Sequence, residues 1–314
     1  MENLIFSLNA TVPLFLVMVL GYIFRQIGLF KGAIIGDMNN FVFKVALPCA
    51  LFTDLAGEDF FAMWDLTFVL YCFLTTCACI AMSIIIAHVM GDKDIVGEFA
   101  QASYRSSAAL LGIAFVENLY GHAGMAPLML AFVVPTYNVM AVVILTVFKP
   151  GGSGMSRDTL LGTLKGIATN PIIWGILLGV FWSVCDVPRP AIFTKTVKYM
   201  ANLCTPMGLM VVGASFDIHA ACGRIKPALI AATLKLVGWC AVFLPVAVML
   251  GFTHDKLLAA LTMLGTPTTV SSFVMAKSMG HESTLSSSTV MLTTMFSAFT
   301  LTGWVYLLKT LGLL

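Results

Sequence analysis

Long apolar runs separated by short polar segments dominate the pattern of this chain. Each run approaches the ~20 residues that an α-helix needs to cross the hydrocarbon core of a bilayer. The pattern therefore predicts an all-α polytopic membrane protein with ten transmembrane helices. The runs cover residues 5–24, 38–56, 66–90, 98–119, 125–148, 160–183, 191–216, 226–251, 255–280 and 283–308.

The ninth run, 255–280, has a polar interruption in its middle that reads GTPTTVSS from Gly265. Pro267 lacks a backbone N–H and clashes with the carbonyl four residues earlier, and groups freed in hydrocarbon must be satisfied by protein or by water in a cavity. Two interpretations fit. One is a helix broken around a substrate site, as in many secondary transporters; the other is a kinked helix whose hydroxyls bond to their own backbone.

Proline and glycine recur at a nearly constant offset, which indicates an internal repeat. Because each copy holds five spans, the second copy enters the membrane from the opposite face. This predicts a single membrane domain, with residues 1–150 as the first five-helix repeat and 151–314 as the second, inverted repeat. The pairs are Pro13 with Pro171, Gly21 with Gly179, Pro48 with Pro206 and Leu51 with Leu209, each 158 residues apart, and Gly121 with Gly280, 159 apart.

The repeat gives the ninth span a partner, which is the fourth span, 98–119. Its middle holds Ser106, Ser107 and Gly112 but no proline, so it is a softer break. Weakened helices at matching places in two halves point to a transporter's binding site. We therefore expect helices 4 and 9 to be broken and to cross.

Composition narrows the function classes. The chain is 59% hydrophobic and 10% charged, far below the quarter that is typical of soluble domains, and a net charge of +2 does not suggest a nucleic-acid partner. The eight cysteines form neither a disulfide framework nor a metal site. No HExxH, GxSxG or phosphate-loop motif occurs. We expect no catalytic residue, no metal and no cofactor, and hence no enzyme.

The basic residues orient the chain, because Lys and Arg are enriched in cytoplasmic loops. Twelve of the seventeen fall on the side that is reached after the first span. The expected location is the plasma or inner membrane, with both termini outside the cytoplasm.

Of the cations inside predicted spans, Arg105 in the fourth and Lys235 in the eighth are the candidate counter-charges, because Lys44 and Lys277 lie nearer the inner interface. A guanidinium binds a carboxylate bidentately, and half-helix N-termini also favour anions. Alternatively, Arg105 reaches the headgroups or pairs with Glu98. No carboxylate lies clearly at mid-membrane, so coupling to protons, coupling to sodium through oxygen ligands, and no coupling all remain open.

Several segments resemble the auxin efflux carrier family, namely NFVFKVALPCALF, NPIIWGILLGVF, TPMGLMVVGASF and TPTTVSSFVMAKSMG, together with Asn138 in VPTYNVM. The resemblance implies ten spans in two inverted halves, an architecture related to bile-acid symporters and sodium/proton antiporters, and a homodimer. Bacterial members resemble malate and malonate carriers, whereas plant members export auxin. The fourth span departs from the family's Asn-x-Gly-x-x-Gly-x-Pro, since it has Ser107, Ala109, Gly112 and Ala114, and Ser271 stands where Asn is frequent.

These observations predict a secondary transporter of a small di- or monocarboxylate in the lipid bilayer, with alternating access at the crossing of helices 4 and 9. The alternatives are an exporter of indole carboxylates, a sodium-coupled bile-acid-type symporter and a membrane sensor. The candidate substrate-binding residues are Arg105, Ser106, Ser107, Gly112, Asn138, Gly265, Thr266, Pro267, Thr268, Thr269, Ser271 and Ser272.

Overall fold

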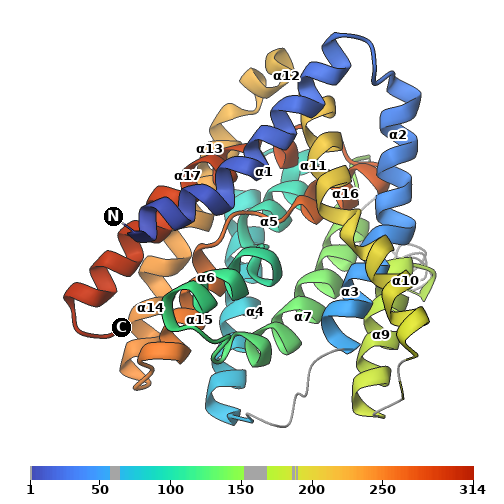
Figure 1. Cartoon of the computed structure of the whole chain (residues 1–314). Coiled ribbons are helices and arrows are strands. Elements are labelled where there is room, and N and C mark those ends of the chain that lie inside the picture. The colour runs from blue at the N-terminus through green and yellow to red at the C-terminus, as the bar shows by residue number, and fades with distance from the viewer. Residues whose placement is uncertain (1, 57–63, 152–167, 186–187, 189) are drawn as a thin grey trace.

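The computed structural model describes residues 2–56, 64–151, 168–185, 188 and 190–314, and these residues contain helices and no strand (Figure 1). Seven helices within these described residues are long and apolar enough to cross a membrane. The prediction of an all-α polytopic membrane protein is confirmed, and the count of ten spans stays a prediction. The seven helices are Leu4–Gln26, Gly32–Ala56, Leu66–Val89, Ala126–Val147, Ile225–Met249, His254–Ser278 and Thr284–Thr310.

The first half of the chain forms helices that correspond to the first five predicted spans. They are α1 (Glu2–Gln26), α2 (Gly32–Phe41), α3 (Leu47–Ala56), α4 (Leu66–Val89), α5 (Val96–Tyr104), α6 (Ile113–Tyr120) and α7 (Ala126–Val147). Two π-helical turns, Val42–Ala46 and Ala108–Gly112, lead into α3 and α6, and a 3₁₀ turn, Lys93–Ile95, leads into α5.

The second half begins within the described residues at α9, so the start of predicted span 160–183 lies outside them. Its helices are α9 (Pro171–Val184), α10 (Ala191–Asn202), α11 (Cys204–Ser215), α12 (Ile218–Gly223), α13 (Ile225–Thr233), α14 (Trp239–Met249), α15 (His254–Gly265), α16 (Val270–Ser278) and α17 (Thr284–Thr310). A π-helical turn, Leu234–Gly238, joins α13 to α14.

Predicted spans 38–56 and 191–216 each change their helical geometry just before a proline. The π-helical turn ends at Ala46, two residues before Pro48, and α10 gives way to α11 at Leu203, three residues before Pro206. A proline lacks the N–H of a regular helix and its ring pushes the preceding carbonyl aside. Neither segment is therefore one regular α-helix.

Glycines let helices from the two halves of the chain touch backbone to backbone. A Cβ added at Gly21 in α1 would overlap the carbonyl oxygen of Met210 in α11. A Cβ added at Gly179 in α9 would lie 3.2 Å from the carbonyl oxygen of Phe52 in α3. Both the glycines and the residues that they touch are 158 positions apart, so the two contacts repeat each other. Small residues allow such close approach between membrane helices.

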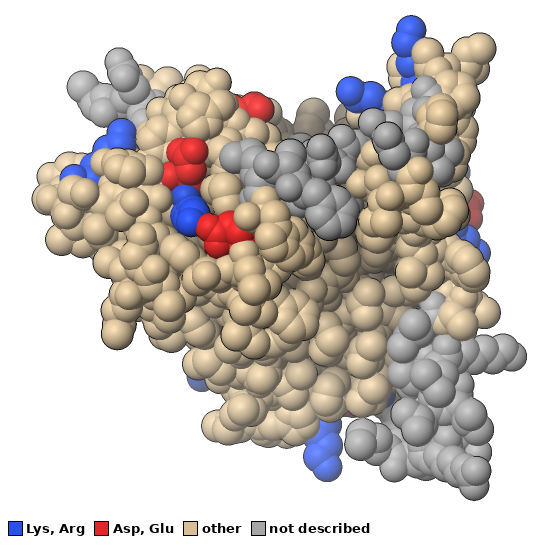
Figure 2. All heavy atoms as spheres, turned by 90° about the horizontal axis from the view of Figure 1, so that it is seen from below, with Lys and Arg blue, Asp and Glu red and all other residues tan. Residues whose placement is uncertain are grey.

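Charged side chains pair near the ends of helices. Arg224 contacts Asp92 and Glu282, and Lys256 contacts Asp65. The face in Figure 2 is mostly uncharged, with basic and acidic side chains in scattered groups. This distribution suits helices whose sides face lipid.

Candidate substrate-binding site

Two helices are broken at the centre of the molecule and their breaks touch. The chain is non-helical from Arg105 to Ser107, after α5, and from Thr266 to Thr269, after α15. The ninth predicted span is therefore a broken helix and not a kinked but continuous one. The two breaks bond to each other: the Ser107 N–H donates to the Pro267 carbonyl at 2.9 Å, and Thr268 Oγ1 donates to the Ala102 carbonyl at 2.7 Å.

These contacts explain why the fourth span breaks without a proline. The N–H of Ser107 is drawn to a carbonyl of the other break instead of to its own helix. Ser106 Oγ adds a bond to Thr266 Oγ1 and one to the Thr262 carbonyl, which lies 3.3 Å away. Each break thus supplies partners for backbone groups that the other has freed, as hydrocarbon requires.

Arg105 lies at the crossing and is buried, with 2% of its surface exposed. It also lines a cavity. Nη2 donates to Asn138 Oδ1 and Ser271 Oγ, both at 2.8 Å, and Nη1 donates to Gln101 Oε1 at 3.1 Å and lies 2.8 Å from Met275 Sδ. Within the described residues Nε has no partner and no carboxylate forms an ion pair with Arg105. The guanidinium is therefore held by neutral groups alone.

The alternative partner for Arg105, Glu98, is engaged elsewhere. Its carboxylate accepts the N–H of Ser283 at 2.7 Å, and it accepts the N–H and Oγ of Ser286 at 3.2 and 3.1 Å. Glu98 thereby caps the N-terminus of α17. Arg105 neither pairs with Glu98 nor extends to the surface of the molecule.

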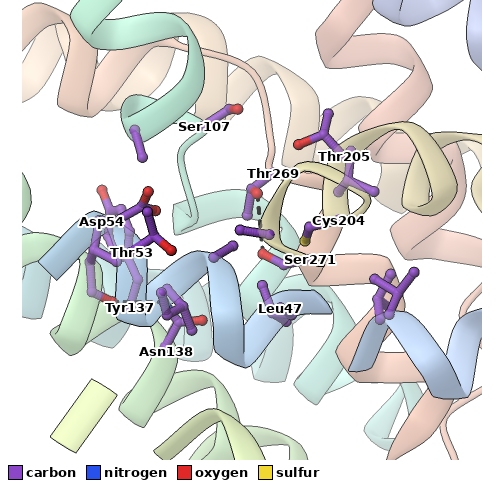
Figure 3. A pocket seen from close by; sticks show the side chains of 18 of the residues that line it. Leu47, Thr53, Asp54, Ser107, Tyr137, Asn138, Cys204, Thr205, Thr269 and Ser271 are labelled. Carbon is purple, nitrogen blue, oxygen red and sulfur yellow. Dashed lines mark hydrogen bonds between the residues drawn. The ribbon is translucent and has the colours of Figure 1, made fainter. Parts of the chain in front are cut away.

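A cavity of about 620 Å³ lies beside the crossing, within the range of small-molecule sites. The first turns of both second half-helices line it, through Ser107 and Ala109 on one side and Thr269 to Ser271 on the other. Figure 3 shows Ser107, Thr269 and Ser271 near Cys204 and Thr205 of α11, with Tyr137 and Asn138 of α7 and Thr53 and Asp54 of α3 around them. Positive helix ends and Arg105 therefore share one cavity.

The candidate residues divide into two groups. Six line the cavity: Arg105, Ser106, Ser107, Asn138, Thr269 and Ser271. The other six are not among its lining residues. Gly112 packs on Thr262 and Gly265 packs on Cys240. The Ser272 carbonyl accepts a hydrogen bond from Gln101 Nε2 at 2.7 Å. Thr266, Pro267 and Thr268 form the bonds between the breaks.

The opposite wall contains residues that the sequence did not point to. It comes from α3, α10 and α11 and includes Thr53, Asp54, Lys198, Asn202 and Thr205. A signal was present, because α3 and α11 begin beside Pro48 and Pro206, which are one of the repeated pairs. Asp54, near the end of α3, lines the cavity as well. Gln101 was missed although a signal was present, because it lies one helical turn before Arg105, whose Nη1 donates to its Oε1.

A polytopic helical protein with a cavity beside two crossing broken helices has the architecture of a membrane transporter. The family comparison agrees, since the model described as "Membrane transport protein" matches residues 6–305. The chain belongs to this family of membrane transport proteins, the auxin efflux carrier family that its motifs resemble.

Three relatives are similar to this chain at low identity. A protein of Rhizobium meliloti named "Putative malonate transporter" is 24% identical, over 95% of this chain and 94% of its own length. An "Uncharacterized transporter" of Methanothermobacter thermautotrophicus is 21% identical, over 74% and 75%. The "Uncharacterized transporter YfdV" of Escherichia coli K12 is 22% identical, over 69% and 70%.

Proposed function

We propose that this protein is a secondary transporter of a small organic anion and that the substrate carboxylate binds beside Arg105. One observation carries the proposal: a buried guanidinium with neutral partners lines a cavity inside a membrane protein. An intramembrane charge is costly and is usually kept for function. A bound carboxylate would supply the missing negative charge and form charge-assisted hydrogen bonds.

The helix ends support the same substrate class. The half-helices that begin after the two breaks place their first turns at the cavity, through Ser107 and Ala109 and through Thr269 and Val270. The N–H groups of a first turn have no partner within their own helix, and they carry partial positive charge. An anion between the two ends would bond to both.

A dicarboxylate such as malonate or malate is the substrate that we favour. The Rhizobium relative is named for malonate. In this chain Lys198 and Asn202 lie on the wall formed by α10, and they offer donors for a second carboxylate. Indole carboxylates and bile-acid-like anions are the alternative substrates. Unlike malonate and malate, they do not have two carboxylates close together.

Transport would proceed by alternating access between two inverted repeats, 1–150 and 151–314. The paired contacts of Gly21 with Met210 and of Gly179 with Phe52 support this symmetry. By the distribution of basic residues both termini would lie outside the cytoplasm. A homodimer is expected from the family resemblance alone.

Substrate binding to the purified protein tests the proposal. A ligand that binds only the folded state raises the midpoint of thermal unfolding, so malonate, malate, acetate and indole-3-acetate are compared. Arg105→Gln should weaken binding of the preferred anion about ten- to a hundredfold, as expected for lost charge-assisted bonds, and Arg105→Lys should weaken it less.

Arg224→Gln is the matched control, because Arg224 is a partly exposed arginine in ion pairs away from the cavity. It should leave affinity unchanged. If Arg105→Gln is folded and binds the anion as the wild type does, the carboxylate does not bind at Arg105. If none of the four anions raises the unfolding midpoint or enters proteoliposomes, the proposed substrate class is wrong.

A further inference from the structure

The carbonyl ends of the two first half-helices are covered by donors from within the protein. At the end of α15, the Leu264 carbonyl accepts from Lys235 Nζ and the Met263 carbonyl accepts from the Tyr137 hydroxyl at 3.4 Å. At the end of α5, the Ser103 carbonyl accepts from Trp239 Nε1 at 2.7 Å. The negative ends of the broken helices are thus closed off, whereas the positive ends line the cavity.

A single helical segment supplies donors to both negative ends. Lys235 lies in the π-helical turn Leu234–Gly238 and Trp239 begins α14 directly after it. Residues four apart lie on the same side of a helix, so one face of this segment meets α15 through Lys235 and α5 through Trp239. The segment therefore acts as a clamp on the crossing.

The amino group of Lys235 lies inside the protein. None of its surface is exposed, and within the described part of the chain no carboxylate forms an ion pair with it. Its bond is to the last turn of a half-helix, where the helix dipole places partial negative charge and favours a cation. Such half-helix ends coordinate the coupling sodium in several transporter folds.

We propose that the ammonium of Lys235 is a tethered cation that fills the place of a coupling sodium ion at the end of α15. The inference rests on the proposed function and deepens it. It names the positive charge that balances the partial negative charge at the end of α15 during transport. Sodium takes oxygen ligands, as hard cations do. The Leu264 carbonyl is already bonded to the lysine, and the Thr262 carbonyl is bonded to Thr266 and Ser106. Lys235 is a positioning residue, since it acts on the substrate through α15.

The first experiment uses the wild-type protein in proteoliposomes. Malonate uptake is measured at constant pH with sodium or choline as the external cation. We expect equal rates. A rate at least tenfold higher in sodium would overturn the proposal, because a separate sodium site would then be needed. If malonate and the other anions do not enter at all, the proposed function fails, and the second experiment still decides the role of Lys235.

The second experiment measures thermal unfolding of variants in sodium, choline or methylammonium chloride. Lys235→Ala leaves room for a small cation, so methylammonium should raise its unfolding midpoint in a concentration-dependent way. Lys235→Met fills the same space without charge and should not respond. Lys44→Ala is the matched control, because Lys44 also lies in a π-helical turn of a span but is exposed.

Transport by the variants completes the test. Lys235→Met should carry malonate about tenfold more slowly or worse, the factor that one lost charge-assisted bond corresponds to. If Lys235→Ala does not fold, the Lys235→Met variant and the sodium experiment decide. The proposal is overturned if Lys235→Met transports as the wild type does, or if methylammonium stabilises Lys44→Ala as much as Lys235→Ala.

Discussion

The backbone N–H of Ser107 donates to the carbonyl oxygen of Pro267 at 2.9 Å. This bond joins two helices that lie far apart in the sequence at the points where each is broken. It also gives the proline a role beyond breaking its own helix, because the carbonyl that accepts the bond belongs to the proline itself. The geometry of the crossing therefore depends on α15 staying broken.

Pro267→Ala tests this dependence. Alanine restores a backbone N–H and favours helix, so α15 and α16 should tend to join and withdraw the carbonyl from Ser107. We expect transport to fall about tenfold or more while the yield of folded protein falls much less. Uptake per folded molecule, with the amount taken from size-exclusion chromatography, measures this. Unchanged uptake would mean that the break is maintained without the proline ring.

Ser271 and Thr268 separate the roles of cavity wall and crossing. Ser271 lines the cavity and accepts from Arg105 Nη2 at 2.8 Å. Thr268 is not among the residues that line the cavity, and it donates to the Ala102 carbonyl at 2.7 Å. Ser271→Ala should weaken anion binding several-fold, because one neutral hydrogen bond is worth ~0.5–1.5 kcal/mol. Thr268→Ala should mainly lower the unfolding midpoint, because a buried carbonyl loses its donor.

Isothermal titration with the preferred anion and a thermal unfolding scan of both variants separate the two effects. The Ser271→Thr variant serves as the control, because it retains a hydroxyl at the cavity wall. The assignment is wrong if Thr268→Ala loses affinity while Ser271→Ala does not.

The contact between α1 and α11 gives a prediction about stability. A Cβ added at Gly213 would overlap the carbonyl oxygen of Met18, which is backbone and cannot move aside as a side chain can. Gly213→Ala should therefore destabilise the fold by about 1–3 kcal/mol or prevent folding, the usual result of overpacking. Gly36→Ala is the control, since a Cβ there meets nothing within 4 Å. Equal unfolding midpoints for the two variants in detergent would show that α1 and α11 are not packed as closely as described.

Much of the fold could be predicted because lipid imposes strong rules on sequence. Apolar length marked the helices, and the chemistry of proline marked the break after Gly265. The offset of 158 residues also linked Gly21 to Gly179 before any contact was known. These signals are local, or depend only on spacing, so a single sequence carries them.

The rest of the site depends on contacts between distant segments. The break at Arg105 has no proline, and it is stabilised by the carbonyl of Pro267. The partners of Arg105 come from α7 and α16 as well as from its own helix. The cavity wall on α10 and α11 exists because that span is interrupted at Leu203. The repeat marked where the fourth span weakens and Pro206 marked the interruption of the wall, but no spacing revealed that Asn138 and Ser271 would meet Arg105.

His281, between α16 and α17, gives the last prediction, which concerns pH. Its side chain is buried, and its Nε2 lies 2.8 Å from the Leu145 carbonyl, so Nε2 must carry the proton and donate. Nδ1 is then the unprotonated nitrogen, and it is buried without a partner among the described residues. Burial is the main reason that the pKa of His281 lies below its ordinary value of 6.5, and Lys149 acts in the same direction.

The sign of the pH effect follows from this lowered pKa. The unfolded chain binds a proton at His281 more readily than the folded protein does, so the contribution to stability is fully present above pH 6.5 and is lost as the pH falls through 6.5 toward the lower pKa of the folded state. The midpoint temperature of thermal unfolding of the wild type should therefore decrease as the pH is lowered from 7.5 to 5.5. His281→Gln keeps an N–H that can donate to Leu145 but does not titrate, so its midpoint should fall less. If both proteins lose the same amount of stability on acidification, the proton is taken up elsewhere and His281 is not the responsible group.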